Sequence, residues 1–224
     1  MTLESGGLVR PPAVAGSWYP DTAVKLRAAV TAHLETVDVT PTGDIVAIVV
    51  PHAGLVYSGP VAAHAYQAVA GRAYDVAVLV GPSHHVGFDG VAIYPRGAFD
   101  TPLGPVPVAS EVAEQLMTAS CIRTHPTAHV REHSLEMQLP FLRHVLPETP
   151  IVPLVIGYQE RDTVLALAEA LAGKLAGLNP LIVASTDLSH YFDADRAARL
   201  DGAVIESVTG FDADRLLAEF ERYP

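Results

Sequence analysis

Histidines stand shortly after two apolar segments of the kind that form buried strands, where their side chains could bind a metal ion. His52 follows Ile45–Val50, and the pair His84-His85 follows Tyr74–Val80 in a Gly-Pro-Ser turn. In an open α/β sheet, ligands bind in the crevice beyond the carboxyl ends of the strands, and histidine is the commonest metal ligand. The sequence therefore predicts that these imidazoles converge on a metal site.

Only one histidine of the pair His84-His85 can point into such a site. Adjacent side chains of an extended chain point in opposite directions, so the second histidine is left to bind substrate or to cap a neighbouring loop. Since His52 lies one predicted strand earlier in the chain, we expect a site that it shares with one member of the pair.

A polar segment before an apolar helix, Arg131 to Glu136, offers further candidates. Glu132 and Glu136 are also typical of the first turn of a helix, where carboxylates interact favourably with the helix dipole. An imidazole gains nothing at that position, and this favours His133 as a residue that faces the cleft.

Asp187 and His190 lie three residues apart, just after the apolar segment Leu181–Ser185. One helical turn would bring them to the same side, and a carboxylate that orients an imidazole is a common acid–base arrangement. In the alternative interpretation, Asp187 caps the next helix and His190 lies on the surface.

Composition restricts the class of protein. The 224 residues are 50% apolar and carry a formal net charge of −11, with Lys25 and Lys174 as the two lysines. The positive mean hydropathy indicates a globular chain, and the lack of a basic stripe argues against nucleic-acid binding. A single cysteine, Cys121, excludes an internal disulfide and suits a reducing compartment. Because the sequence shows neither a leader pattern nor a long apolar run, we expect a cytoplasmic protein that does not bind membranes.

The elements that must position these residues alternate between strands and helices. The predicted strands are Ile45–Val50, Tyr74–Val80, Val91–Tyr94, Ile151–Ile156 and Leu181–Ser185. The main predicted helices are Asp21–Val37, Val61–Ala70 with Ser58 as its cap, Ser134–Val145, Arg161–Leu175, Asp195–Val208 and Asp212–Arg222. Their connections are long enough for strands to return in parallel. The fold predicted for residues 1–224 is therefore a single-domain, three-layer α/β/α sandwich with a mostly parallel central sheet. Neither a phosphate-binding glycine loop nor a Gly-x-Ser-x-Gly hydrolase elbow is present.

Five motifs, in order along the chain from about Arg10 onward, closely resemble those of the Memo family, whose bacterial and archaeal members are often labelled AmmeMemoRadiSam system protein B. The motifs are Ala15-Gly16-Ser17-Trp18-Tyr19, Pro51-His52-Ala53-Gly54, Gly81-Pro82-Ser83-His84-His85, Glu132-His133-Ser134-Leu135-Glu136-Met137 and Ser185-Thr186-Asp187-Leu188-Ser189-His190. The resemblance implies a fold similar to class III extradiol ring-cleaving dioxygenases, which use non-haem Fe(II).

The resemblance also implies roles for individual residues. His52 and His84 would ligate the metal, Fe(II) or copper, and Asp187 and His190 would line the same cleft. We predict that His190 acts as an acid–base group oriented by Asp187, with His133 as a further catalytic residue. The residues predicted to line the substrate cleft are His85, Glu136 and Trp18.

The chain departs from the family pattern in its ligand set. A cysteine that serves as the third metal ligand in the family is expected after the last helix, and this chain stops at Tyr223-Pro224 before such a motif. We therefore expect a chain truncated at its C-terminus, or a metal completed by Asp187, His190 or an anion.

The function expected from these features is a Memo-like, non-haem iron (or copper) dependent oxidoreductase or redox protein that acts on a small molecule. Ring cleavage itself is not expected, because the ligands differ from those of the ring-cleaving enzymes. One alternative is a non-catalytic module that binds a peptide or protein in the same cleft, since Memo proteins are associated with phosphopeptide-type recognition in animals. Another alternative is a hydrolase that uses a metal-bound water.

Overall fold

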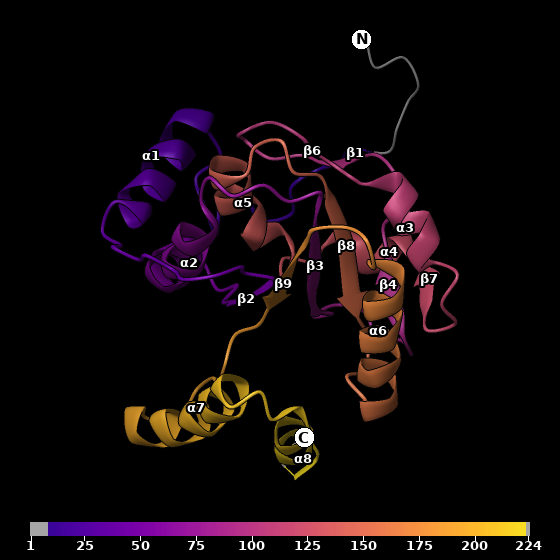
Figure 1. Cartoon of the computed structure of the whole chain (residues 1–224). Helices are drawn as coiled ribbons and strands as arrows, with labels where there is room; N and C mark the ends of the chain where they lie inside the picture. The colour runs from indigo at the N-terminus through magenta and orange to yellow at the C-terminus, as the bar shows by residue number, and fades with distance from the viewer. Residues whose placement is uncertain (1–8, 223–224) are drawn as a thin grey trace. The chain divides into compact units, whose positions relative to one another are not determined.

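The computed structural model of the chain describes residues 9–222, which form two compact units. The first unit runs to Thr186 and the second begins at Asp187. Each unit has its own secondary structure, and each is described by itself below (Figure 1).

The first unit is built around a six-stranded sheet with the strand order β2-β9-β3-β8-β4-β7. These strands are β2 (Ala47–Val50), β3 (Val76–Pro82), β4 (Val91–Ile93), β7 (Ile122–Thr124), β8 (Ile151–Ile156) and β9 (Pro180–Ser185). Strands β2, β9, β3 and β8 are mutually parallel, whereas β4 is antiparallel to β8 and parallel to β7. The predicted α/β fold with a mostly parallel central sheet is confirmed.

Helices cover both faces of this sheet. They are α1 (Ala23–Leu34), α2 (Leu55–Val69), α3 (Ser110–Leu116), α4 (Pro126–Val130), α5 (Leu139–Val145) and α6 (Arg161–Lys174), with a short 3₁₀ helix at Glu136–Gln138. The connections β2–α2–β3 and β8–α6–β9 cross the sheet in opposite directions, so the right-handedness of such crossovers places α2 and α6 on opposite faces. Helices α1 and α5 pack against α2, and α3 packs against α6, which gives three layers (Figure 1).

Burial along the strands follows from these layers. Val76–Leu79 of β3 and Ile151–Val155 of β8 are buried residue after residue because both of their faces are covered. The edge strand β2 instead alternates, with Ile48 and Val50 buried and their neighbours exposed. Tyr66 of α2 and Phe141 of α5 stack with ring centroids 5.2 Å apart and join the helices on one face.

The N-terminal segment is held by a second, smaller sheet. Strand β1 (Val9–Arg10) pairs in parallel with β5 (Ala98–Phe99), which pairs antiparallel with β6 (Val106–Pro107). This pairing holds Arg10 inside the first unit, where its side chain is 4% exposed.

Helix α2 begins earlier than the sequence pattern predicts. The helix starts at Leu55 and continues through Pro60, and Ser58 lies in its first turn with its hydroxyl donating to the Ala53 carbonyl at 2.7 Å. Because Leu55, Ala62 and Tyr66 are buried against the core, packing outweighs the backbone hydrogen bond that the proline removes. The start of α2 therefore lies three residues after His52.

The second unit contains α7 (Ala194–Thr209) and α8 (Ala213–Arg222). The N-cap of α7 is Asp193, whose carboxylate accepts a hydrogen bond from the Arg196 backbone N–H at 2.9 Å. The alternative in which Asp187 caps this helix is thus wrong, because five residues separate Asp187 from the N-cap that the helix uses. Within the described part of the chain, no helix has the length and apolar character needed to span a membrane.

Candidate metal centre

The two predicted metal ligands lie at the same edge of the central sheet. His52 follows β2 and His84 follows β3, each two residues after the strand's last residue. These strands are consecutive among the parallel strands of the chain but are not adjacent in the sheet, because β9 lies between them. Ser185 at the end of β9 is paired with Val50 of β2, so its side chain belongs to the same edge.

The structure brings three histidines together here: His52, His84 and His133. Each offers a ring nitrogen within 4.8 Å of those of the other two. Their ring centroids are 5.2 Å apart for His52 and His84, 5.8 Å for His52 and His133, and 4.3 Å for His84 and His133. His52 and His133 are buried, whereas the His84 side chain is 36% exposed and opens the cluster to solvent.

His133 reaches this cluster because the segment that carries it is fastened to β3. The Ser134 hydroxyl donates to the Pro82 carbonyl at 2.9 Å. A Cβ atom on Gly81 would lie 2.9 Å from the Ser134 hydroxyl oxygen, so only glycine permits this approach. The close packing of β3 and residue 134 sets His133 beside His84.

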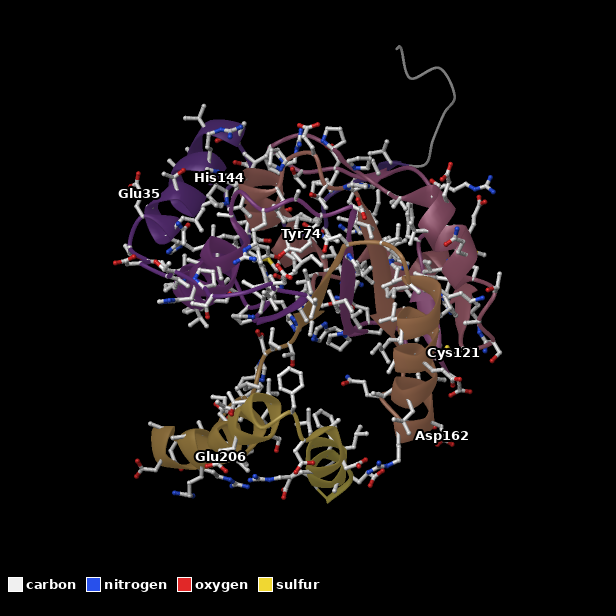
Figure 2. All side chains as sticks on the ribbon, in the orientation of Figure 1. Glu35, Tyr74, Cys121, His144, Asp162 and Glu206 are labelled. Atoms are coloured by element: carbon white, nitrogen blue, oxygen red, sulfur yellow. The ribbon has the colours of Figure 1, made fainter. Side chains whose placement is uncertain are left out.

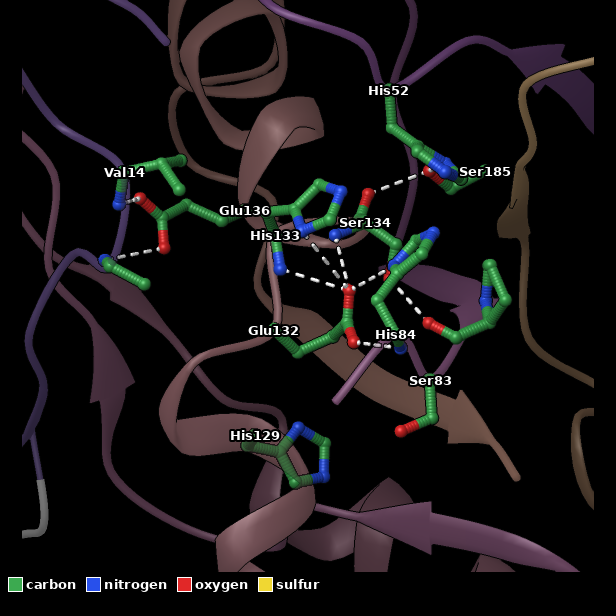
Figure 3. Close-up of polar contacts among 12 residues, drawn as sticks. Val14, His52, Ser83, His84, His129, Glu132, His133, Ser134, Glu136 and Ser185 are labelled. Carbon is green, nitrogen blue, oxygen red and sulfur yellow. Dashed lines mark hydrogen bonds and ion pairs between the residues drawn. The ribbon is translucent and has the colours of Figure 1, made fainter. Parts of the chain in front are cut away.

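Glu132, which the sequence pattern left as an ordinary first-turn carboxylate, lies directly against the histidine cluster. Its carboxylate accepts hydrogen bonds from His84 Nδ1 at 2.8 Å and from the His84 backbone N–H at 2.6 Å (Figure 3). The backbone N–H groups of His133 and Ser134 donate to the same carboxylate, each at 2.9 Å. The only hint in the sequence is its position next to His133.

These contacts determine the charge of Glu132 and the proton position on His84. Burial alone would raise the pKa of Glu132, but the hydrogen bonds from the side chain and backbone of His84 and from the Ser134 backbone outweigh it and lower this pKa to about 2. An ionised carboxylate can only accept, so His84 Nδ1 carries a proton. The carboxylate thereby orients the His84 ring, with Nε2 on the side of the ring away from Glu132.

His133 is neutral near pH 7, because burial, with the charge of His84 as the next contribution, lowers its pKa to about 4. Its ring lies 4.3 Å from the Trp18 ring, centroid to centroid, at an interplanar angle of 54°. The exposed His85 is 6.0 Å from His133 by the same measure. Trp18 and His85, both predicted to line the cleft, thus lie beside the cluster.

Glu136 is directed away from the three histidines and into the N-terminal segment. Its fully buried carboxylate pairs with Arg10 and accepts hydrogen bonds from the backbone N–H groups of Ala13 and Val14 and, at 2.6 Å, from the Tyr19 hydroxyl. Figure 3 shows it turned toward Val14. Glu136 therefore ties residues 10–19, Trp18 among them, to the first unit, and its carboxylate is engaged there and not at the histidines.

Asp187 and His190 belong to the second unit. The Asp187 carboxylate lies 3.6 Å from His190 Nε2, and His190 Nδ1 is 2.7 Å from the Leu188 carbonyl, to which it donates. The side chain of His190 is 56% exposed. The expected proximity of this carboxylate and imidazole is present, and their roles in the metal site stay predictions.

Cys121, the only cysteine of the chain, does not complete the histidine cluster. It directly precedes β7, at the opposite edge of the sheet from β2 (Figure 2). Among the described residues, the cluster able to hold a metal consists of histidines alone.

A third buried histidine, His129, lies outside the cluster. It is 1% exposed and packs against the rings of Tyr94 and Phe99, with centroids 5.6 and 6.2 Å away. Burial, with the positive charge of Arg10 as the next contribution, lowers the pKa of His129 to about 4. The unfolded chain therefore binds more protons than the folded chain between that value and the ordinary value of 6.5, so stability falls as the pH drops through this window.

We expect this pH dependence to be weaker in His129→Gln. Between about pH 7.5 and about pH 4.5, the variant should lose about 2 kcal/mol less free energy of unfolding than the parent protein. Urea denaturation at the two pH values measures the difference. His64→Gln, at an exposed position on α2, is the matched control and should follow the parent. Equal losses in parent and His129→Gln would contradict the assignment.

Together, the fold and the cluster define a class: an α/β protein with a histidine cluster able to bind a metal at the carboxyl ends of its parallel strands. The chain belongs to the Memo family, because the family described as "Memo-like protein" matches residues 10–224. The resemblance seen in the sequence motifs is thus confirmed.

Relatives agree with this assignment. The chain is 36% identical over 230 residues to a MEMO1 family protein of Methanobrevibacter smithii, in an alignment that covers 96% of this chain and 82% of the relative. It is 38% identical over 225 residues to a MEMO1 family protein of Thermotoga maritima, covering 92% of this chain and 79% of the relative.

Proposed function

We propose that this Memo protein binds one redox-active transition metal, iron or copper, through His52, His84 and His133, and serves as an oxidoreductase or redox protein for a small molecule. The observation that carries the proposal is the convergence of three imidazole nitrogens within 4.8 Å of one another at the carboxyl end of the sheet. Two of the three residues, His52 and His133, are buried, which is unusual for histidines that have only a surface role.

The chemistry of this donor set fits such a metal. Imidazole suits iron, copper and zinc, whereas magnesium and calcium prefer oxygen ligands. His133 is neutral near pH 7, so its ring need not lose a proton to bind a cation. Nitrogens on one metal at about 2.1 Å lie at most about 4.2 Å apart, so the rings need only small rotations to bind.

The chain's own residues give the site its orientation and charge. When bound, the metal supplies Lewis acidity and one-electron chemistry. Glu132 holds His84 and places an ionised carboxylate behind the cluster, which complements a cation. Trp18 flanks His133, while the exposed face of His84 leaves the cluster open to a substrate.

Anaerobic titration with Fe(II) tests this proposal, with Cu(I) in parallel. We expect saturation near one metal per chain in the parent protein and loss of binding in His52→Ala, which removes one of the three nitrogens. His64→Ala removes an exposed histidine of α2 and should bind like the parent. Failure of the parent protein to retain either metal would overturn the proposal.

One observation favours the alternative of a peptide-binding module. Exposed apolar side chains gather at the start of α2 and beside the cluster: Val56 and Tyr57 are 81% and 82% exposed, and Trp18 is 36% exposed. They are neighbours, since the Leu55 backbone N–H donates to the Trp18 carbonyl. Under this alternative, a phosphopeptide would bind the metal-free protein and lose affinity in Trp18→Ala, and His52→Ala would bind it normally.

A further inference from the structure

We propose that Ser185 is a positioning residue of the metal site: its hydroxyl holds the His52 ring with the proton on Nδ1, so that Nε2 carries the lone pair for the metal. The metal-binding half of this inference rests on the proposed function. The proton position on His52 does not, because it follows from hydrogen bonds within the protein.

Ser185 lies where a serine can control His52. It ends β9, between the strands that lead to the two histidines, and it is 3% exposed. Its hydroxyl oxygen is 3.0 Å from His52 Nδ1, 2.8 Å from Gln138 Nε2 and 2.6 Å from the Ser134 carbonyl oxygen. Figure 3 shows Ser185 at the His52 ring, with a dashed line that joins it to Ser134.

The directions of these three hydrogen bonds follow from the chemistry of the groups. A serine hydroxyl has one proton to donate and two lone pairs that accept. The Ser134 carbonyl can only accept, so Ser185 gives its single proton there. The two remaining partners must then donate to Ser185.

The amide of Gln138 independently fits this direction. Its Nε2 is 3.1 Å from the Pro51 carbonyl, which can only accept, so the nitrogen must lie on that side. Its Oε1 is 3.0 Å from the Tyr66 hydroxyl, and burial raises the pKa of Tyr66, so that phenol keeps its proton and donates. The Gln138 amide nitrogen is therefore a donor to Ser185, which leaves one lone pair of Ser185 for His52.

His52 must therefore donate a hydrogen bond from Nδ1–H to that lone pair of Ser185. In the neutral ring, the proton then sits on Nδ1 and the lone pair on Nε2. Glu132 likewise accepts from Nδ1 of His84, although the acceptor for His52 is a neutral hydroxyl instead of a carboxylate. Both strand-end histidines are thus held as Nε2 ligands by groups outside the metal's own ligand set.

Two-bond ¹H–¹⁵N correlation spectra of protein labelled with ¹⁵N-histidine report directly which ring nitrogen carries the proton. In the metal-free parent protein near pH 7, we expect His52 as the Nδ1–H tautomer. In Ser185→Ala, which removes the acceptor, we expect the Nε2–H tautomer of His52 to appear and Fe(II) affinity to fall about 10- to 100-fold.

Tyr66→Phe is the matched control. It removes a hydroxyl from the far end of the same chain of hydrogen bonds and leaves the contact between Ser185 and His52 in place. We expect the tautomer of His52 to stay as in the parent, and Fe(II) affinity to change less than threefold. Similar changes in Tyr66→Phe and Ser185→Ala would indicate a general packing effect and overturn the assignment.

The outcomes separate this inference from the proposed function. An Nε2–H tautomer for His52 in the metal-free parent protein overturns the inference even if the protein binds iron. An unchanged tautomer and affinity in Ser185→Ala also overturns it. If the parent protein binds no metal, the proposed function fails, and the spectra of parent and variant still decide whether Ser185 sets the His52 tautomer.

Discussion

Arg10→Met is expected to lower the free energy of unfolding of the first unit by about 3–5 kcal/mol, because it leaves a buried carboxylate without its counter-charge. Glu136 is fully buried and pairs with Arg10, which is itself only 4% exposed. The same guanidinium donates to the His129 carbonyl at 2.8 Å and to the Glu132 carbonyl, and these acceptors would also lose their partner. Urea denaturation followed by circular dichroism measures the loss.

An exposed ion pair supplies the control for this variant. Arg96 Nη2 lies 2.7 Å from Glu114 Oε1 in an ion pair, and the two side chains are 72% and 52% exposed. Arg96→Met should cost no more than about 1 kcal/mol, since water screens an exposed pair. In Arg10→Met combined with Glu136→Gln, which removes the unpaired charge, we expect part of the lost stability to return. A similar loss in free energy of unfolding for Arg10→Met and Arg96→Met would contradict the prediction, because burial of the Arg10–Glu136 pair would then add nothing to its contribution.

Glu132→Gln is expected to weaken both the fold and the metal site. The carboxylate receives only donors, four in number, from His84, His133 and Ser134. An amide would direct its own N–H group at one of them, at a cost of about 1–3 kcal/mol. Since His84 would also lose the carboxylate that orients its ring, we expect Fe(II) affinity to fall about 10- to 100-fold.

Competition with a chromogenic chelator measures that affinity, and urea denaturation measures the stability. Glu114→Gln, which changes an exposed carboxylate in the same way, should leave both unchanged. If Glu132→Gln bound Fe(II) as tightly as the parent protein, Glu132 would have no part in orienting the site.

The local sequence predicted much of the fold and located the centre of the site. Continuous apolar runs marked β3 and β8 because strands covered on both faces need apolar residues at every position. His52 and His84 were found because each follows such a run, where open α/β sheets bind ligands. His133 was expected to face inward because an imidazole had no other reason to stand at the start of a helix.

Other features depend on residues that are far apart in the chain. Glu132 looked like a first-turn carboxylate, and only folding brings it to His84, 48 residues earlier. Glu136 was predicted to line the cleft, but its partner Arg10 is 126 residues away. The start of α2 was misplaced at Val61, because burial of Leu55 and Tyr66 outweighs the local signal of Pro60.

The sequence by itself thus determined the family, the α/β fold and the two strand-end histidines, since periodicity and strand ends are properties of neighbouring residues. Only the tertiary structure decided what surrounds those histidines. The order of strands in the sheet inserts β9 between β2 and β3, and this places Ser185 against His52 although 133 residues separate them. Hydrogen bonds of that kind depend on sheet topology, which no local pattern of residues encodes.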